Sequence, residues 1–205
     1  MESVLTNAFG AFIKYSDWIV WNLFLAFIPL LFSFWLFRWH RKGRSFLWWL
    51  GLIIFVAFLP NAPYLLTDII HLIEAIRAGY SIWITTLVLI PLHLLAIFLG
   101  WEAYVISLIN QSYYLEKHKA KKFIVFSEIM AHVLCAVGIY LGRFIRFNSW
   151  DLVTQPNIIF ASTLNDLTDR KPLLVMFITF IILTLLYWLT KQINLGVMLQ
   201  MRSRK

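Results

Sequence analysis

Five apolar segments, most of them as long as a membrane-spanning helix, dominate the chain and limit what it can fold into. A helix needs about 20 apolar residues to cross the hydrocarbon core of a bilayer. The segments cover residues 18–37, 46–59 (or 46–66), 82–101, 123–141 and 173–190. A chain that is 61% hydrophobic and 14% charged cannot bury so much apolar surface in a soluble domain of this size. We therefore predict one all-α membrane domain over residues 1–205, a bundle of about five transmembrane helices.

The lysines and arginines lie between the apolar segments and are unevenly divided. Twelve follow the first, third and fifth segments, and six lie on the other side. Loops rich in Lys and Arg stay in the cytoplasm, so we expect the N-terminus outside and the C-terminus inside. Such loops contact anionic membrane lipids, and they carry no nucleic-acid recognition module. We expect membrane lipids as partners and no nucleic acid.

Several kinds of chemistry have no sequence signal. The single cysteine, Cys135, excludes a disulfide framework and a Cys-rich zinc site. Walker loops, dinucleotide glycine motifs, zinc-protease motifs and nucleophile elbows are absent from the sequence. We predict no metal and no cofactor.

The second apolar segment ends in the motif Pro60-Asn61-Ala62-Pro63-Tyr64. Two prolines remove two backbone donors, break the helix and push Ala62 towards extended geometry. The break is either a helix end with a turn or a re-entrant break that shapes an outward-facing pocket. For the second case, Asn61 and Tyr64 are candidate substrate-binding residues.

A short amphipathic helix is predicted next, with Thr67 or Asp68 as its N-cap and Arg77 at its end. One face is apolar and comprises Ile69, Ile70, Ile73 and Ile76. The other is polar and comprises Asp68, His71, Glu74 and Arg77. The helix either lies in the membrane interface with a solvated polar face, or uses Asp68 and His71 as a catalytic acid/base pair.

A third polar motif, residues 140–151, follows the fourth apolar segment. It places Arg143 and Arg146 next to the membrane on the side that is poor in positive charge. Arginine binds carboxylate and phosphate in planar, bidentate geometry. The two arginines either form a structural clasp with Asp151, Asp68 or lipid phosphates, or hold an anionic substrate group such as a lipid phosphate. The candidate substrate-binding residues here are Arg143, Arg146, Asn148 and Asp151.

Three ionisable side chains fall inside apolar segments: His93, Glu128 and His132. Charged groups at that depth are costly and indicate function by default. We expect the two histidines at a similar depth and Glu128 on the same helix face as His132. The alternatives are a Glu–His hydrogen bond between helices and a proton path. Two histidines alone do not identify a haem site.

With these motifs in view, the chain resembles a bacterial membrane-protein family, the domain of unknown function thirteen sixty-one. The matching segments are 58–64 with Thr67, Asp68 and His71, then 138–151, and the pair Trp21-Asn22. Phe147 stands where the family pattern would have Trp. The resemblance implies a multi-pass protein of the bacterial inner membrane and carries over no activity.

Three functional hypotheses follow from these patterns. The first is an enzyme or binding protein for an anionic, lipid-linked substrate at the outer face, where both long motifs end. The second is a small transporter that uses the broken helix as a gate and the intramembrane His and Glu side chains as a path. The third is a noncatalytic subunit that docks another membrane protein.

The predicted orientation can be tested with a reporter that is active only in the cytoplasm. We expect no signal when the reporter is inserted within residues 61–81, because that segment should lie outside. The same reporter at the C-terminus is the positive control. A cytoplasmic signal from residues 61–81 would overturn the orientation.

Overall fold

The structure is a computed structural model that describes residues 2–39, 44–147 and 151–204, and this part of the chain folds into helices without strands. The first half contains α1 (Glu2–Phe34), the π-helical turn η1 (Trp35–Trp39), α2 (Phe46–Phe58), α3 (Asn61–Tyr64), the 3-10 turn η2 (Leu65–Asp68) and α4 (Ile69–Arg77). The middle contains α5 (Ile82–Ile84), the π-helical turn η3 (Thr85–Leu89), α6 (Ile90–Lys117) and the 3-10 turn η4 (Lys121–Phe123). The rest comprises α7 (Ile124–Tyr140), the π-helical turn η5 (Leu141–Ile145), α8 (Asp151–Thr154), α9 (Pro156–Thr168) and α10 (Arg170–Ser203).

Five helical stretches in the described part are long and apolar enough to cross a membrane, which confirms the predicted all-α class and number of spans. They are Ala8–Trp39, Phe46–Arg77, Ile82–Lys117, Lys121–Ile145 and Arg170–Met201. Each is longer than the apolar segment that predicted it, so Lys14, Arg77, Arg143 and Lys191 lie within helices rather than in loops. A helix satisfies its own backbone hydrogen bonds and can therefore continue beyond its apolar run.

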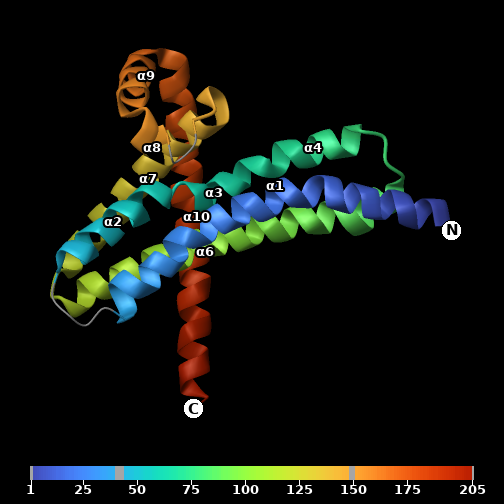
Figure 1. Ribbon diagram of the computed structural model, residues 1–205. Coiled ribbons are helices and arrows are strands. Elements are labelled where there is room, and N and C mark those ends of the chain that lie inside the picture. The colour runs from blue at the N-terminus through green and yellow to red at the C-terminus, as the bar shows by residue number, and fades with distance from the viewer. Residues whose placement is uncertain (1, 40–43, 148–150, 205) are drawn as a thin grey trace.

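The helices form a long tilted group that α10 crosses steeply (Figure 1). Helices α1 and α6 pack along each other, and α2, α3 and α4 follow one another as a third, broken rod beside them. Helix α7 packs against α10, and α9 lies by the N-terminal part of α10. The main core centres on α6, where Tyr104, Val105 and Leu108 are fully buried.

The broken rod keeps a helical path through its prolines. Helix α2 ends at Phe58, and Pro60 occupies the N-cap position of α3 with φ −61° and ψ −25°. Pro63 lies in the first turn of α3, where a backbone N–H has no intrahelical partner. Ala62 is therefore helical, and the expectation that Pro63 would extend it is wrong.

Two glycines, one on α6 and one on α7, allow the proline-containing segment to pack closely against these helices. A Cβ on Gly100 of α6 would lie 2.7 Å from Leu65 Cδ1 and 3.0 Å from the Ala62 carbonyl oxygen. A Cβ on Gly138 of α7 would lie 2.6 Å from Pro60 Cβ. Small residues allow helices to approach closely inside membranes. The segment from Pro60 to Leu65 is thus packed between α6 and α7.

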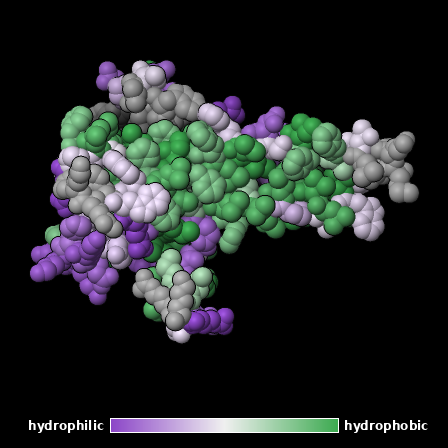
Figure 2. All heavy atoms as spheres, turned by 60° about the horizontal axis from the view of Figure 1, so that its bottom comes forward, coloured by the Kyte–Doolittle hydropathy of each residue, from purple (hydrophilic) through white to green (hydrophobic). Residues whose placement is uncertain are grey.

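Apolar side chains cover the length of the helical group, and a large polar group lies at the end where α2 begins and α6 ends (Figure 2). The exposed basic residues at that end are Arg44, Lys117, Lys119, Lys121 and Lys122. The isoleucine face of α4 is also exposed, with Ile70 and Ile73 each 44% accessible, while Leu72 and Ala75 are buried. This distribution matches a protein whose outer surface contacts hydrocarbon along the group and water at the ends.

An ion pair links α7 to α10 deep in the bundle. Lys191 Nζ lies 2.5 Å from Glu128 Oε1, and the same oxygen accepts hydrogen bonds from Tyr187 at 2.8 Å and Ser112 at 2.7 Å. Glu128 is therefore ion-paired with a lysine, whereas the sequence offers a neutral Glu–His hydrogen bond between helices as one alternative. The sequence places Lys191 one residue beyond an apolar segment, so its folding back onto Glu128 could not be anticipated.

Replacing Glu128 by Gln should destabilise the protein, because Lys191 would keep its charge in a largely buried position. We expect a loss of about 3 kcal/mol in the free energy of unfolding, measured by denaturant titration in mild detergent. The matched control is Glu116→Gln, which breaks the exposed pair with Lys121 and should cost less than about 1 kcal/mol. The double variant Glu128→Gln/Lys191→Met should recover most of the loss. Equal stability of Glu128→Gln and Glu116→Gln would contradict this role.

Candidate functional site

The two long polar motifs meet in an ion pair between η2 and η5. Asp68 Oδ1 lies 2.5 Å from Arg143 Nη2, and only 3% of the Asp68 side chain and 14% of the Arg143 side chain are exposed. Arg143 lies within a π-helical turn, a feature that is frequent at functional sites. The structure thus brings together two segments that are 75 residues apart in the sequence.

Asp68 is held by partners on both carboxylate oxygens. Arg143 donates to Oδ1, and the Asn22 amide on α1 donates to Oδ2 at 3.2 Å. Asp68 does occupy the N-cap position of α4, but its side chain makes no capping hydrogen bond. The prediction of a side-chain cap is therefore wrong, because the buried guanidinium competes for the carboxylate. Asp68 acts as the counter-ion of Arg143.

Thr67 completes the support of the guanidinium. Its Oγ1 accepts hydrogen bonds from Arg143 Nε at 3.0 Å and Nη2 at 2.6 Å, and it donates to the Tyr64 carbonyl at 2.7 Å. The guanidinium carbon also lies 4.5 Å from the centre of the Tyr64 ring, within cation–π range. A Cβ on Gly142 would approach that ring to 3.1 Å. Arg143 is therefore fixed in one position by packing and hydrogen bonds together.

His71 pairs with Glu74 rather than with Asp68. Its Nδ1 lies 3.1 Å from Glu74 Oε2, and its Nε2 lies 3.2 Å from Arg143 Nη1. A guanidinium can only donate hydrogen bonds, so Nε2 is the acceptor. The ring proton is therefore on Nδ1, which donates a hydrogen bond to the Glu74 carboxylate. Trp18 of α1 packs on the imidazole, with ring centres 4.7 Å apart. The carboxylate–imidazole pair of this site is thus Glu74–His71, and the predicted Asp68–His71 pair has no direct hydrogen bond.

Arg146 differs from Arg143 in its surroundings. It ends η5 in the left-handed conformation, with φ 66° and ψ 31°, and the next residue, Phe147, donates its N–H to the Leu141 carbonyl at 3.1 Å. Left-handed backbone is uncommon for a residue other than glycine. Within residues 2–39, 44–147 and 151–204 the Arg146 guanidinium has no hydrogen-bond or ion-pair partner. The site therefore combines one neutralised arginine with one that is not neutralised.

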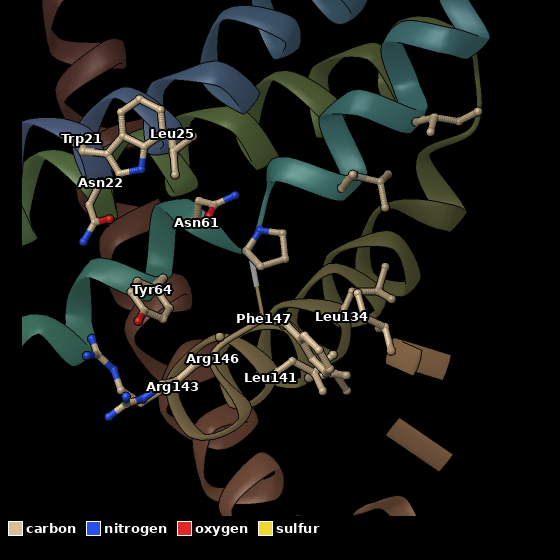
Figure 3. Close-up of a pocket in the computed structure, with 18 of the residues that line it drawn as sticks. Trp21, Asn22, Leu25, Asn61, Tyr64, Leu134, Leu141, Arg143, Arg146 and Phe147 are labelled. Carbon is tan, nitrogen blue, oxygen red and sulfur yellow. The ribbon is translucent and has the colours of Figure 1, made fainter. Parts of the chain in front are cut away.

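Both arginines line one cavity of about 1090 Å³. In Figure 3 Arg143 and Arg146 lie below Tyr64, and the apolar side chains of Leu141 and Leu134 lie farther to the right. The polar lining residues are Asn22, Asn61, Tyr64, His71, Glu74, Arg143 and Arg146. Most apolar lining residues come from α1, α2, α7 and η5, among them Trp21, Leu25, Trp49, Leu52, Ile53, Val56, Val137 and Leu141. The cavity thus has a polar end, with Arg143, Arg146 and Glu74, and an apolar part.

The other predicted substrate-binding residues have different positions. Asn61 lines the cavity, and its amide donates to the Phe58 carbonyl at 3.0 Å. Asp151 begins α8, where the Thr154 hydroxyl lies 3.5 Å from its carboxylate, and it does not line the cavity. Asn148 lies outside the described residues.

The intramembrane polar residues do not form one group. His132 is bound to the Tyr104 hydroxyl at 2.5 Å, and Tyr104 is 11 residues from His93 on α6, which corresponds to about 16 Å of helix. The two histidines therefore lie apart along the direction of α6 and do not form a pair. His93 lies instead against Trp18, with ring centres 5.7 Å apart, near the cavity. In the part of the chain that the structure describes, no group of three His, Cys, Asp or Glu side chains could hold a metal ion.

Sequence reasoning missed three members of the site: Asn22, Thr67 and Glu74. Asn22 is a polar residue in an otherwise apolar segment, and Glu74 follows His71 at helical spacing, so each left a sequence signal. Thr67 was considered only as an N-cap. The contacts of all three depend on tertiary packing that no local pattern encodes.

A sequence model of the family described as "Protein of unknown function (DUF1361)" matches residues 21–185. The matched range contains every residue that lines the cavity. No curated protein and no solved structure matches the chain. The family that the sequence resembles is therefore confirmed.

The contact between α7 and the broken rod can be tested with Gly138→Ala. The new Cβ would force Pro60 to move, so we expect a loss of about 1–3 kcal/mol in the free energy of unfolding. The control is Gly196→Ala on α10, where nothing lies within 4 Å of the added Cβ, and it should be neutral or stabilising. If both variants behave alike in the same denaturant titration, the close packing is not required.

Proposed function

The chain belongs to the DUF1361 family of unknown function, and we propose that it binds an anionic group, such as a phosphate, between Arg143 and Arg146. The observation that carries this proposal concerns Arg146, which lines the same cavity as the fixed Arg143 and has no ion-pair or hydrogen-bond partner among the described residues. Arginine recognises phosphate and carboxylate through paired N–H donors. A rigid donor loses little conformational freedom when a ligand binds.

The arrangement of charges supports an anion at the Arg146 side of the site. Asp68 neutralises Arg143 from the buried side, away from the cavity. Arg143 makes four hydrogen bonds to Thr67, Asp68 and His71, and a guanidinium has five N–H donors. One donor on Nη1 is therefore left for a ligand that also contacts Arg146.

Both ring nitrogens of His71 and both carboxylate oxygens of Asp68 are engaged, so we propose a positioning role for these two residues rather than acid/base chemistry. His71 lines the cavity and has Glu74 on its Nδ1, an arrangement that fixes the tautomer and orientation of an imidazole. Both oxygens of Asp68 are engaged and its side chain is buried. We assign to Asp68 and His71 the positioning of Arg143, because both accept a hydrogen bond from its guanidinium.

The location of the site follows from the charge distribution along the sequence. With twelve basic residues on one side and six on the other, we propose that the cavity opens at the outer face of a bacterial inner membrane. The transporter alternative is less well supported, because His132 and His93 are about three turns apart and Glu128 is paired with Lys191.

The proposal is tested by binding of glycerol 3-phosphate to the purified protein in detergent, measured by isothermal titration calorimetry. We expect Arg146→Gln to weaken binding by about tenfold, because a charge-assisted hydrogen bond is lost. The control is Arg77→Gln, which removes one positive charge from α4 outside the cavity and should change affinity by less than about twofold, because exposed charges are screened. Equal affinity of Arg146→Gln and wild type would contradict the proposal.

A further inference from the structure

We infer that the bound anion is the headgroup of a lipid, and that a hydrocarbon chain of this lipid lies in the apolar part of the same cavity, between α2 and α7. This inference rests on the proposed anion site and adds the chemical class of its ligand. Three features carry it: an apolar stripe on α2, a facing apolar wall, and a separation of the two helices.

The stripe on α2 has the spacing of one helix face. It comprises Trp49, Leu52, Ile53, Val56 and Ala57, all of which line the cavity. The positions follow the i, i+3, i+4, i+7, i+8 pattern of a single face and extend over about 12 Å of helix. This face leads from the beginning of α2 towards the break at Pro60, beyond which Tyr64 and the arginines lie.

The facing wall comes from α7 and α1. Helix α7 contributes Leu134 and Val137, and η5, which continues it, contributes Leu141, at i, i+3 and i+7. Helix α1 contributes Trp21 and Leu25, at i and i+4. Both sets are again single helix faces. The part of the cavity between α2, α7 and α1 is therefore lined mainly by apolar side chains, and the polar residues lie at its arginine end.

Helices α2 and α7 are held apart along this wall. Helix α7 packs closely on α3, where Gly138 meets Pro60, and much less on α2 itself. The α2 side chains that border the resulting groove are open to the surroundings, with Ile53 65% and Trp49 49% exposed. On a membrane-spanning helix these side chains face the bilayer, so a chain can enter sideways from the hydrocarbon region.

The continuity of the groove with the arginine end selects a lipid over a free anion. A phosphate ion would fill only the polar end of a cavity of about 1090 Å³. A lipid with an anionic headgroup matches both ends, because its charge meets Arg146 and its methylene groups meet the stripe on α2. The phosphate of such a lipid would lie between the two arginines, and its hydrocarbon chain would lie between α2 and α7.

The first experiment counts bound dioleoyl phosphatidic acid by native mass spectrometry after extraction from membranes of defined composition. Val137→Trp fills the groove and should lower retention of this lipid by about tenfold, since a few buried methylene groups lose their place. Val125→Trp is the matched control, because Val125 lies on the same helix, is 65% exposed and does not line the cavity. Retention by Val137→Trp at the level of Val125→Trp would overturn the inference.

The second measurement separates this inference from the anion site itself. Glycerol 3-phosphate has the same headgroup without chains, and Val137→Trp should bind it as tightly as wild type does. If Val137→Trp leaves both ligands unaffected while Arg146→Gln weakens both, the site takes a free anion and the chain groove is refuted. If Arg146→Gln weakens neither ligand, the proposed function fails as well.

A third measurement uses the wild-type protein, so that it does not depend on how a variant folds. Phosphatidic acid with a diazirine on its acyl chain should label α2 and α7 at the groove, with Ile53 and Val56 among the modified residues. Excess unlabelled phosphatidic acid should suppress this labelling, and excess phosphatidylcholine should not. Labelling confined to the exposed face of α10 would contradict a chain between α2 and α7.

Discussion

The ion pair between Asp68 and Arg143 holds the candidate site together, because it joins η2, in the middle of the broken rod, to η5 at the end of α7. Two charges removed from water lose hydration that their mutual attraction recovers only when further hydrogen bonds are made. Asn22 and Thr67 supply those bonds from α1 and η2. The pair therefore fixes α1, η2 and η5 relative to one another. The other polar residues of the site, Tyr64, His71 and Arg146, lie around it.

The break in the rod formed by α2, α3 and α4 does more than end a helix. The two prolines leave the path helical, but the rod changes from α-helix to a 3-10 turn at η2 before it resumes as α4. A change of helical pitch rotates the side chains that follow it. Thr67 and His71 thereby face α7, while the isoleucines of α4 face outwards.

Much of the fold could be predicted, because a membrane-spanning helix requires a long apolar segment and leaves most Lys and Arg residues outside it. Apolar length and the placement of Lys and Arg gave five spans, and the same charges indicated that Asp68 and Arg143 end on one side. Partners could not be predicted where they depend on side-chain reach across helices. Lys191, which the sequence places just beyond an apolar segment, reaches Glu128 in the structure. By contrast, the pairing of Arg143 with Asp68 is one of the alternatives that the sequence offers, and the structure contains it. Helices α8 and α9 had no periodic signal strong enough to be recognised.

The separation of the two charges along the chain has a consequence for biosynthesis. Arg143 follows Asp68 by 75 residues, so at about 5–20 residues per second Asp68 waits roughly 4–15 s for its counter-ion. Asn22, by contrast, precedes it by 46 residues and is already in place when Asp68 leaves the ribosome. The Asn22 amide is thus the first tertiary partner available to this carboxylate, and the site is completed only when α7 has been inserted.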